Sequence, residues 1–209
     1  TATSDTERAG LLVGRISKSS SAASGILAYN SSAKLTINGA EQTGEAVKAI
    51  GEGSLTYPEG VNETDVIKAF TAEQLKSGEV AYLLAEGKVL GEQVWGQQLG
   101  KDQYPVPGSD NKVIKAAQGD KDANGNYTYW ATFSNQTNDV TLSVPSDRTL
   151  KVYNATVSGG KMTLTQRSNN QVAKEEGVLL KTDGEYVNAK ANKTNELTAA
   201  SSDENHLVA

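Results

Sequence analysis

The sequence predicts a mainly β protein with a small α component. We expect a β-rich N-terminal part with one capped helix, followed by an all-β, sandwich-like domain. Three observations lead to this prediction: short apolar segments between turn-forming residues in the first part, one set of helix-start signals in the middle, and period-two strands in the last part. A chain of 209 residues can form one or two small domains of this kind.

The N-terminal part is rich in Gly, Ser and other small residues. Short apolar pieces at 10–14, 25–29 and 35–38 predict strands, because turn-forming residues separate them. Their small, regular spacing fits the rungs of a repetitive β-structure as well as irregular hairpins. Of these two alternatives we prefer the rungs.

One helix start is clearly marked. Thr71 is a good N-cap residue, and Gln74 lies three positions further on, where it completes a capping box. Phe70 and Leu75 occupy the two positions of a hydrophobic staple. The helix should therefore begin at the residue after Thr71, and Gly78 either interrupts it or separates two short helical turns.

The C-terminal part changes to strands rich in β-branched and aromatic residues. These strands are expected at 127–133, 140–144, 150–155 and 162–165. Gly159-Gly160 and Asp183-Gly184 are typical of hairpin turns. The polar stretch 119–126 is then the expected linker between a first domain at 1–118 and a sandwich-like domain at 127–209.

Composition excludes several classes of function. The chain has no cysteine, which rules out disulfides, thiolate metal sites and a cysteine nucleophile. A formal net charge of −5 and the lack of a Lys/Arg run argue against nucleic acid as a partner. Apolar runs are far shorter than the roughly 18 residues that cross a bilayer, so no membrane insertion by this fragment is expected.

Aromatic residues are the best candidates for binding a ligand. Trp95, Tyr104 and Trp130 are the three we single out, because exposed aromatic faces stack on sugar rings or anchor protein partners. In the segment 127–133 the odd-numbered residues share one strand face, which we expect to lie in the core. Trp130 then points to the opposite face.

One segment has the spacing of the first half of a calcium loop. Asp120, Asp122 and Asn124 place oxygen ligands at alternate positions before Gly125. The position that should carry the bidentate carboxylate is Ala131, so the match is incomplete. A polar turn is the preferred interpretation, and calcium is the only cofactor that the sequence suggests.

No catalytic constellation stands out. His206 is the only histidine, and it lies close to the end of the chain, where a triad or zinc site would be poorly held. A pair of Asp or Glu residues could still hydrolyse a glycoside, but no spacing singles out such a pair. We therefore expect a protein that is not an enzyme, with a carbohydrate-active hydrolase as the alternative.

Two motifs resemble a known class of proteins. The segments 70–84 (FTAEQLKSGEVAYLL) and 95–106 (WGQQLGKDQYPV) closely resemble a module of large secreted or surface proteins of gut bacteria, Bacteroidetes especially. In those proteins the module often follows glycine-rich GLUG motifs, and the segment 9–16 looks like one degenerate repeat of that kind. The part from Tyr129 to Val208 is similar to a β-rich domain common towards the C-terminal end of such proteins.

This resemblance implies a location more firmly than a chemistry. It implies an extracellular or cell-surface module that forms part of a longer polypeptide. The expected function is adhesion to a host protein or glycan, or the spacing of other domains.

Overall fold

The computed structural model describes residues 13–15, 27–37, 39–44, 47–52, 55–85 and 88–207. Its described part is mainly β and contains three short helices, which confirms the predicted fold class. The chain divides into two compact units, residues 1–75 (unit 1) and 76–209 (unit 2). Each unit is described by itself.

Unit 1 is built from pairs of short strands. Strand β1 (Val13–Arg15) pairs in parallel with β5 (Ile50–Glu52), β2 (Leu27–Asn30) pairs in parallel with β6 (Ile67–Phe70), and β3 (Thr36–Ile37) forms a hairpin with β4 (Ala40–Glu41). Unit 1 therefore contains separate parallel pairs as well as a hairpin, and the rungs of a repetitive β-structure stay a prediction. The GLUG-like segment 9–16 lies outside the described residues except for β1.

Helix α1 (Glu63–Val66) leads directly into β6, and the capped helix of the sequence follows it. The Thr71 hydroxyl accepts the Gln74 N–H at 3.2 Å, and the Gln74 side-chain oxygen accepts the Thr71 N–H at 3.0 Å, so the predicted capping box is present. Helix α2 (Ala72–Ser77) ends at Gly78, whose φ is +99°, and α3 (Glu79–Leu84) begins after it. Gly78 therefore separates two short helices.

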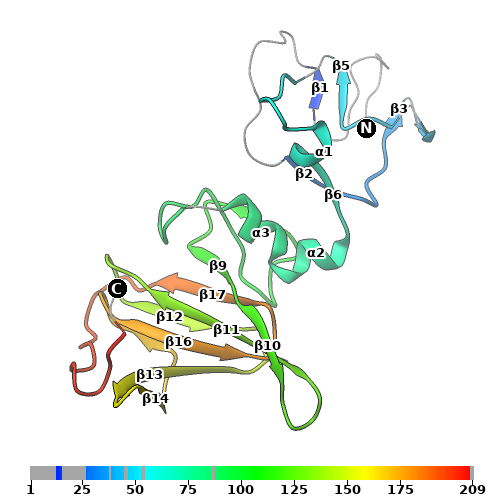
Figure 1. Ribbon diagram of the computed structural model, residues 1–209. Coiled ribbons are helices and arrows are strands. Elements are labelled where there is room, and N and C mark those ends of the chain that lie inside the picture. The colour runs from blue at the N-terminus through cyan, green and yellow to red at the C-terminus, as the bar shows by residue number, and fades with distance from the viewer. Residues whose placement is uncertain are drawn as a thin grey trace. The chain divides into compact units, whose positions relative to one another are not determined.

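The described residues of unit 2 form two large antiparallel sheets (Figure 1). The five-stranded sheet has the order β10 (Ala117–Lys121), β11 (Tyr127–Ser134), β16 (Gly177–Thr182), β13 (Leu150–Ser158) and β14 (Lys161–Gln166). The four-stranded sheet has the order β15 (Gln171–Val172), β12 (Val140–Ser143), β17 (Tyr186–Ala191) and β9 (Asn111–Lys115). Only Ala116 separates β9 from β10, so the chain crosses from one sheet to the other at that residue.

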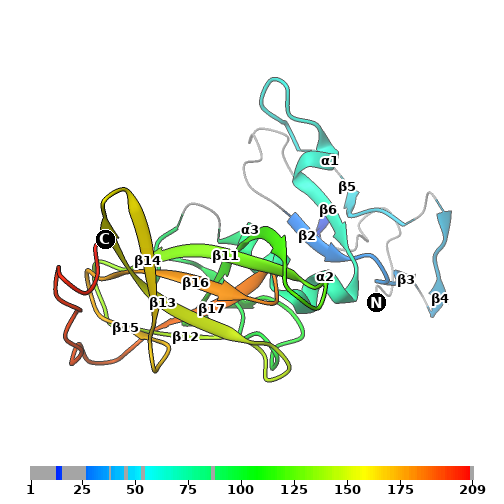
Figure 2. The same cartoon turned by 60° about the horizontal axis from the view of Figure 1, so that its bottom comes forward.

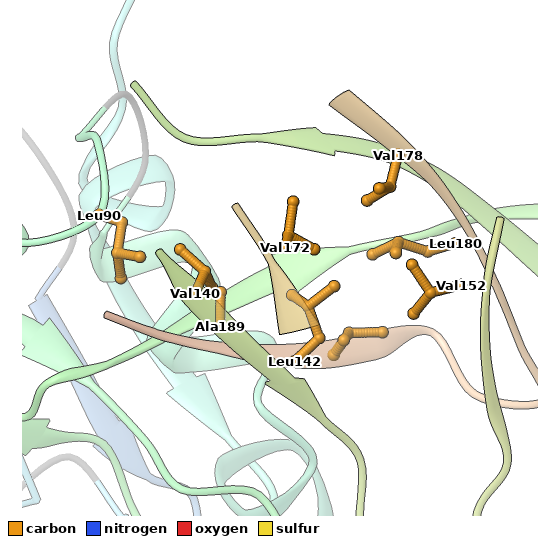
Figure 3. Packing of buried hydrophobic residues seen from close by; sticks show 9 residues of the cluster. Leu90, Val140, Leu142, Val152, Val172, Val178, Leu180 and Ala189 are labelled. Atoms are coloured by element: carbon orange, nitrogen blue, oxygen red, sulfur yellow. The ribbon is translucent and has the colours of Figure 1, made fainter. Parts of the chain in front are cut away.

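One apolar core lies between the two sheets of unit 2 (Figure 3). It combines residues from β12, β13, β15, β16 and β17 with Leu90 from a loop: Leu90, Val140, Leu142, Val152, Val172, Val178, Leu180, Val187 and Ala189. Alternation along β16 sends Val178 and Leu180 into this core, and Leu179 to the outer face. This is the expected sandwich-like arrangement.

The strand β11 follows the predicted alternation for most of its length. Ala131 and Phe133 pack against the core, and Trp130 lies on the opposite face, as expected. Tyr127 departs from the prediction, because 46% of its surface is exposed. It lies at the end of the strand, where the Lys121 ammonium sits 4.8 Å from its ring.

The predicted linker at 119–126 is wrong. Its first residues belong to β10, and residues 122–126 form the turn of the β10–β11 hairpin, closed by a hydrogen bond from the Asp122 N–H to the Asn126 carbonyl at 2.8 Å. A polar, glycine-containing stretch is typical of a hairpin turn as well as of a linker. The units instead divide after Leu75, so the predicted domains 1–118 and 127–209 are also wrong.

The residues before β9 belong to unit 2 because they cover one of its sheets. Ala81 of α3 and Leu99 pack with Val113 on the outer face of the four-stranded sheet. Asn188 of β17, which is 1% exposed, accepts the Leu99 N–H at 2.7 Å and donates to the Gln97 carbonyl at 2.6 Å. This outer layer also includes the short strands β7 (Trp95–Gly96) and β8 (Val106–Pro107).

Buried polar side chains fix the C-terminal segment. The Asp139 carboxylate, which is 1% exposed, accepts the Leu197 N–H at 2.7 Å and the Lys174 N–H at 2.8 Å. Asn205 bridges β13 and β16, because it accepts the Ala155 N–H at 3.1 Å and donates to the Gly177 carbonyl at 2.8 Å. The segment after β17 is thus held by these side chains and by single backbone hydrogen bonds, such as that from the His206 N–H to the Ala155 carbonyl at 2.7 Å.

A side chain at Gly78 should destabilise the protein. Its φ of +99° disfavours other residues, and an added Cβ would lie 2.6 Å from Leu99 Cδ2. We expect Gly78→Ala to lower the free energy of unfolding by about 2–4 kcal/mol in urea titrations. Gly91→Ala is the matched control, because Gly91 has a φ of +95° but open space around it; its cost should be about 1–2 kcal/mol. Equal losses would contradict the packing argument.

Asp139 should make stability depend on pH. Its hydrogen bond from the Leu197 N–H, the largest cause, lowers the pKa of the carboxyl below the usual 3.8. The ionised form therefore stabilises the folded state above 3.8, and this contribution is lost as the pH falls through the lowered pKa. We expect Asp139→Asn to be less stable than the parent at neutral pH and to show a shallower loss of stability in acid. Asp203→Asn, at an exposed carboxylate, is the control and should leave the urea midpoint at neutral pH unchanged.

Candidate functional site

A group of large side chains lies on the outer face of the five-stranded sheet. Trp130 of β11, Lys181 of β16 and Lys151 of β13 are successive Cα partners in one row across the sheet. Tyr153 lies on the same face in the next row, two residues along β13. We call Trp130, Lys151, Tyr153 and Lys181 the outer-face patch.

Ring contacts hold Trp130 in a defined position. The rings of Trp130 and Tyr153 lie 6.2 Å apart with an interplanar angle of 32°, and the Lys181 Nζ lies 5.1 Å from the centroid of the Trp130 ring. On the other side, Gly119 of β10 leaves room for the indole, since a Cβ there would be 2.9 Å from Trp130 Cδ1. The tryptophan is half-buried.

The patch carries two positive charges side by side. Lys151 and Lys181 are direct cross-strand partners, an arrangement of like charges that destabilises a sheet. In the described part of the chain neither lysine pairs with a carboxylate; the ion pairs there involve other residues. An anion bound between the two ammonium groups would remove this repulsion.

A groove of about 890 Å³ continues from the patch to the strand ends. Lys151 and Lys181 line it, together with the β10–β11 hairpin and the loop before β13. Two of its acidic side chains hold loops in place. Asp183 accepts the Thr149 N–H at 3.0 Å and its hydroxyl at 2.9 Å, and Asp122 Oδ1 accepts the Asn124 N–H at 2.9 Å.

The structure separates the three aromatic residues predicted to bind a ligand. Trp95 is half-buried in β7, and Tyr104 is 54% exposed in the loop between β7 and β8. Both belong to the outer layer on the four-stranded sheet, whereas Trp130 lies on the outer face of the five-stranded sheet. The sequence analysis missed Lys151, Tyr153 and Lys181, because only the register of β11, β16 and β13 brings them to Trp130.

The residues of the suggested calcium loop have other roles in the structure. Asp122 Oδ1 also accepts the Asn126 N–H at 2.9 Å, and the Asp120 carbonyl accepts the Thr128 hydroxyl at 2.7 Å. Asn124 contributes its backbone N–H to the turn. Within the described ranges no three His, Cys, Asp or Glu side chains are grouped as a metal site would require. These contacts are those of a hairpin turn.

A second hollow, of about 720 Å³, lies between β9 and the end of β11. Tyr82, Ile114 and Phe133 give it an apolar lining, and Lys112 lies at its wall. Burial lowers the pKa of Lys112, and its ammonium donates to the Lys88 carbonyl. The hydrogen bond from Lys112 to Lys88 joins β9 to the loop that contains Leu90. It gives the buried lysine a structural role.

Comparisons with known proteins do not assign the site. No family model matches the sequence, and no curated protein or solved structure gives a significant match. Among the helices of the described residues, none has the length and apolar character needed to span a membrane. The function must therefore be argued from the chemistry of the site.

Removing one charge of the lysine pair should stabilise unit 2. We expect Lys151→Gln to raise the free energy of unfolding by about 0.2–1 kcal/mol at low salt. The gain should shrink at high salt, which screens exposed charges. Lys190→Gln is the control, because Lys190 lies on β17 opposite the uncharged Asn111 and Thr141 and forms only an exposed ion pair with Asp110 at 3.7 Å, so this variant should gain no stability. A loss of stability in Lys151→Gln would show that the pair is not repulsive.

Proposed function

We propose that unit 2 is a non-catalytic binding module that holds an acidic oligosaccharide on the outer-face patch. The observation that carries this proposal is the cross-strand pair Lys151 and Lys181 beside the rings of Trp130 and Tyr153. Two cations without carboxylate partners attract an anion, and aromatic rings suit the apolar face of a sugar. A charged sugar such as a uronic acid has both features in one residue.

The geometry supports a distinct role for each side chain. The indole of Trp130 and the phenol ring of Tyr153 offer a surface for the C–H face of a pyranose ring. The two ammonium groups offer charge-assisted hydrogen bonds, worth about 1.5–3 kcal/mol each, to its carboxylate. Because Gly119 and the sheet already fix the indole, little ordering of the protein is needed on binding.

The groove beside the patch supports an extended ligand rather than a single sugar. Lys151 and Lys181 belong to both, so a chain that binds at the patch can continue along the groove towards the β10–β11 hairpin and the loop before β13. Arg148 adds a third cation there, although its Nη1 also donates to the Asp183 carbonyl at 2.8 Å. Several sugars of an acidic polysaccharide would fit this arrangement.

The contacts of the acidic residues favour binding over hydrolysis. A glycosidase needs two carboxyl groups roughly 5–10 Å apart on either side of the bond to be cleaved. In the groove, the carboxylates of Asp122 and Asp183 accept hydrogen bonds from the loops that carry them or lie beside them. The outer-face patch itself contains no acid. Asp147 is the third acid that lines the groove, and it would need one of these two hydrogen-bonded carboxylates as its partner, so the hydrolase is the weaker alternative.

Adhesion at a cell surface is the setting that we propose for this module. The resemblance of the segments 70–84 and 95–106 to surface-protein modules supports it, and the lack of cysteine is compatible with secretion. A host or matrix glycan rich in uronic acids would be the partner. Spacing of other domains, without any ligand, is the competing function.

Tryptophan fluorescence can test the proposal in the full chain. We expect a hexamer of galacturonic acid to change the fluorescence of Trp130 in a Trp95→Phe background, and its methyl ester, which lacks the charges, to bind at least tenfold more weakly. Trp130→Ala, examined by calorimetry, should lose binding, since central aromatic contacts often contribute about 2 kcal/mol or more. Lys151→Gln and Lys181→Gln should each weaken binding roughly tenfold, or about 1.4 kcal/mol.

The controls separate the competing functions. Lys190→Gln removes the same charge from the other sheet and should leave the affinity unchanged, and thermal melting should show that each variant is folded. Equal binding of the methyl ester would contradict an acidic ligand. Shortening of the hexamer would contradict a non-catalytic module, and lack of binding to any acidic glycan on an array would favour the spacer.

A further inference from the structure

In the described residues, the two large sheets of unit 2 have four edges, and three of these edges are short, irregular or covered. Strand β15 has two residues, and β10 contains a register shift between Gln118 and Lys121. The edge of β9 is covered, because the Gln97 N–H donates to the Asn111 carbonyl at 3.1 Å. Short strands, bulges and covering loops are the usual means by which β proteins prevent edge pairing.

Strand β14 (Lys161–Gln166) has none of these protections. It is six residues long and pairs with β13 in an unbroken register. All six of its side chains are exposed, so the strand projects beyond the core, and in the described part of the chain it has no neighbour on its other side (Figure 2). Its outer N–H and C=O groups are a template for another strand.

The outer face of β14 is apolar. Met162 is 56% exposed and Leu164 36%, and both lie on the face that carries Tyr153, since their Cα partners on β13 are Val157 and Ala155. Val157 is itself 48% exposed. Large exposed apolar side chains beside an open edge are typical of an interface.

The sequence of β14 is complementary to itself when two copies run antiparallel. Pairing centred on Thr163 sets Met162 opposite Leu164 of the second copy, and Leu164 opposite its Met162, on the same sheet face. The only charge of the strand, Lys161, then meets Thr165. Pairing centred on Leu164 would instead set Met162 opposite the polar Gln166, and Lys161 opposite Arg167, whose charge is balanced by Glu176.

We propose that two copies of this chain dimerise through β14, in antiparallel pairing centred on Thr163. The two five-stranded sheets then form one continuous sheet across a two-fold axis. The dimer rests on the edge and on its apolar side chains, and it does not depend on any ligand of the outer-face patch.

Sedimentation of the full chain tests the dimer. The mass should rise with concentration from 22.0 kDa towards twice that value. The double variant Met162→Lys with Leu164→Lys should stay monomeric, because it sets lysines opposite one another. Val157→Lys adds a charge to the same face one strand further in, and it should still dimerise. A monomer at every concentration, or a dimer that persists in the double variant, would overturn the proposal.

Single cysteines test the register, because the natural chain has none. Thr163→Cys lies opposite itself across the two-fold axis, at a Cα separation that suits a disulfide, so mild oxidation should give a covalent dimer. Thr165→Cys is the matched control, because it replaces the same residue type on the same face of the same strand. In the proposed pairing Thr165 faces Lys161 of the second copy, so this variant should stay monomeric in a denaturing gel. Efficient cross-linking through Thr165→Cys or Leu164→Cys instead would overturn the Thr163-centred pairing.

Discussion

The apolar layer between the two sheets of unit 2 is the constraint on which the other features depend. Val140, Leu180, Val187 and Ala189 are each 0% exposed, and they come from strands of both sheets. Because side chains alternate along a strand, fixing these residues inside fixes their neighbours outside. Lys181 is on the outer face because Leu180 is in the core, and the same holds for Trp130 beside Ala131. A slip of one residue in β16 or β11 would remove the candidate site and the core together.

The outer face of one sheet is covered by other residues, and the outer face of the other sheet is open. Helix α3 and the segment around Leu99 cover the outer face of the four-stranded sheet, with Asn188 hydrogen-bonded to that segment from within the sheet. The outer face of the five-stranded sheet keeps exposed or half-buried aromatic and cationic side chains. A face that is left open despite repulsion between Lys151 and Lys181 suggests a function that outweighs the loss of stability.

The two proposals meet on the five-stranded sheet. A two-fold axis perpendicular to the sheet at Thr163 would keep both outer faces on one side of the dimer. Two outer-face patches would then face the same way, and a long polysaccharide could reach both. Linked sites of this kind raise avidity without any new contact. Even weak binding of an acidic glycan at one patch would then support adhesion.

The sequence by itself determined the local features of this protein. Four features depend on neighbours within a few residues, so their sequence patterns predicted them correctly. They are the capping box of Thr71 and Gln74, the break at Gly78, the strands after residue 127 and the outward direction of Trp130.

Tertiary structure decided the rest. Residues 119–126 belong to the β10–β11 hairpin because β10 pairs with β11. The residues from 76 to the start of β9 belong to unit 2 because Ala81 and Leu99 pack on the four-stranded sheet. The candidate site depends on the pairing of β16 with β11 and β13. Such pairings join residues up to about fifty positions apart, and they are selected by the burial of a shared core that no local pattern encodes.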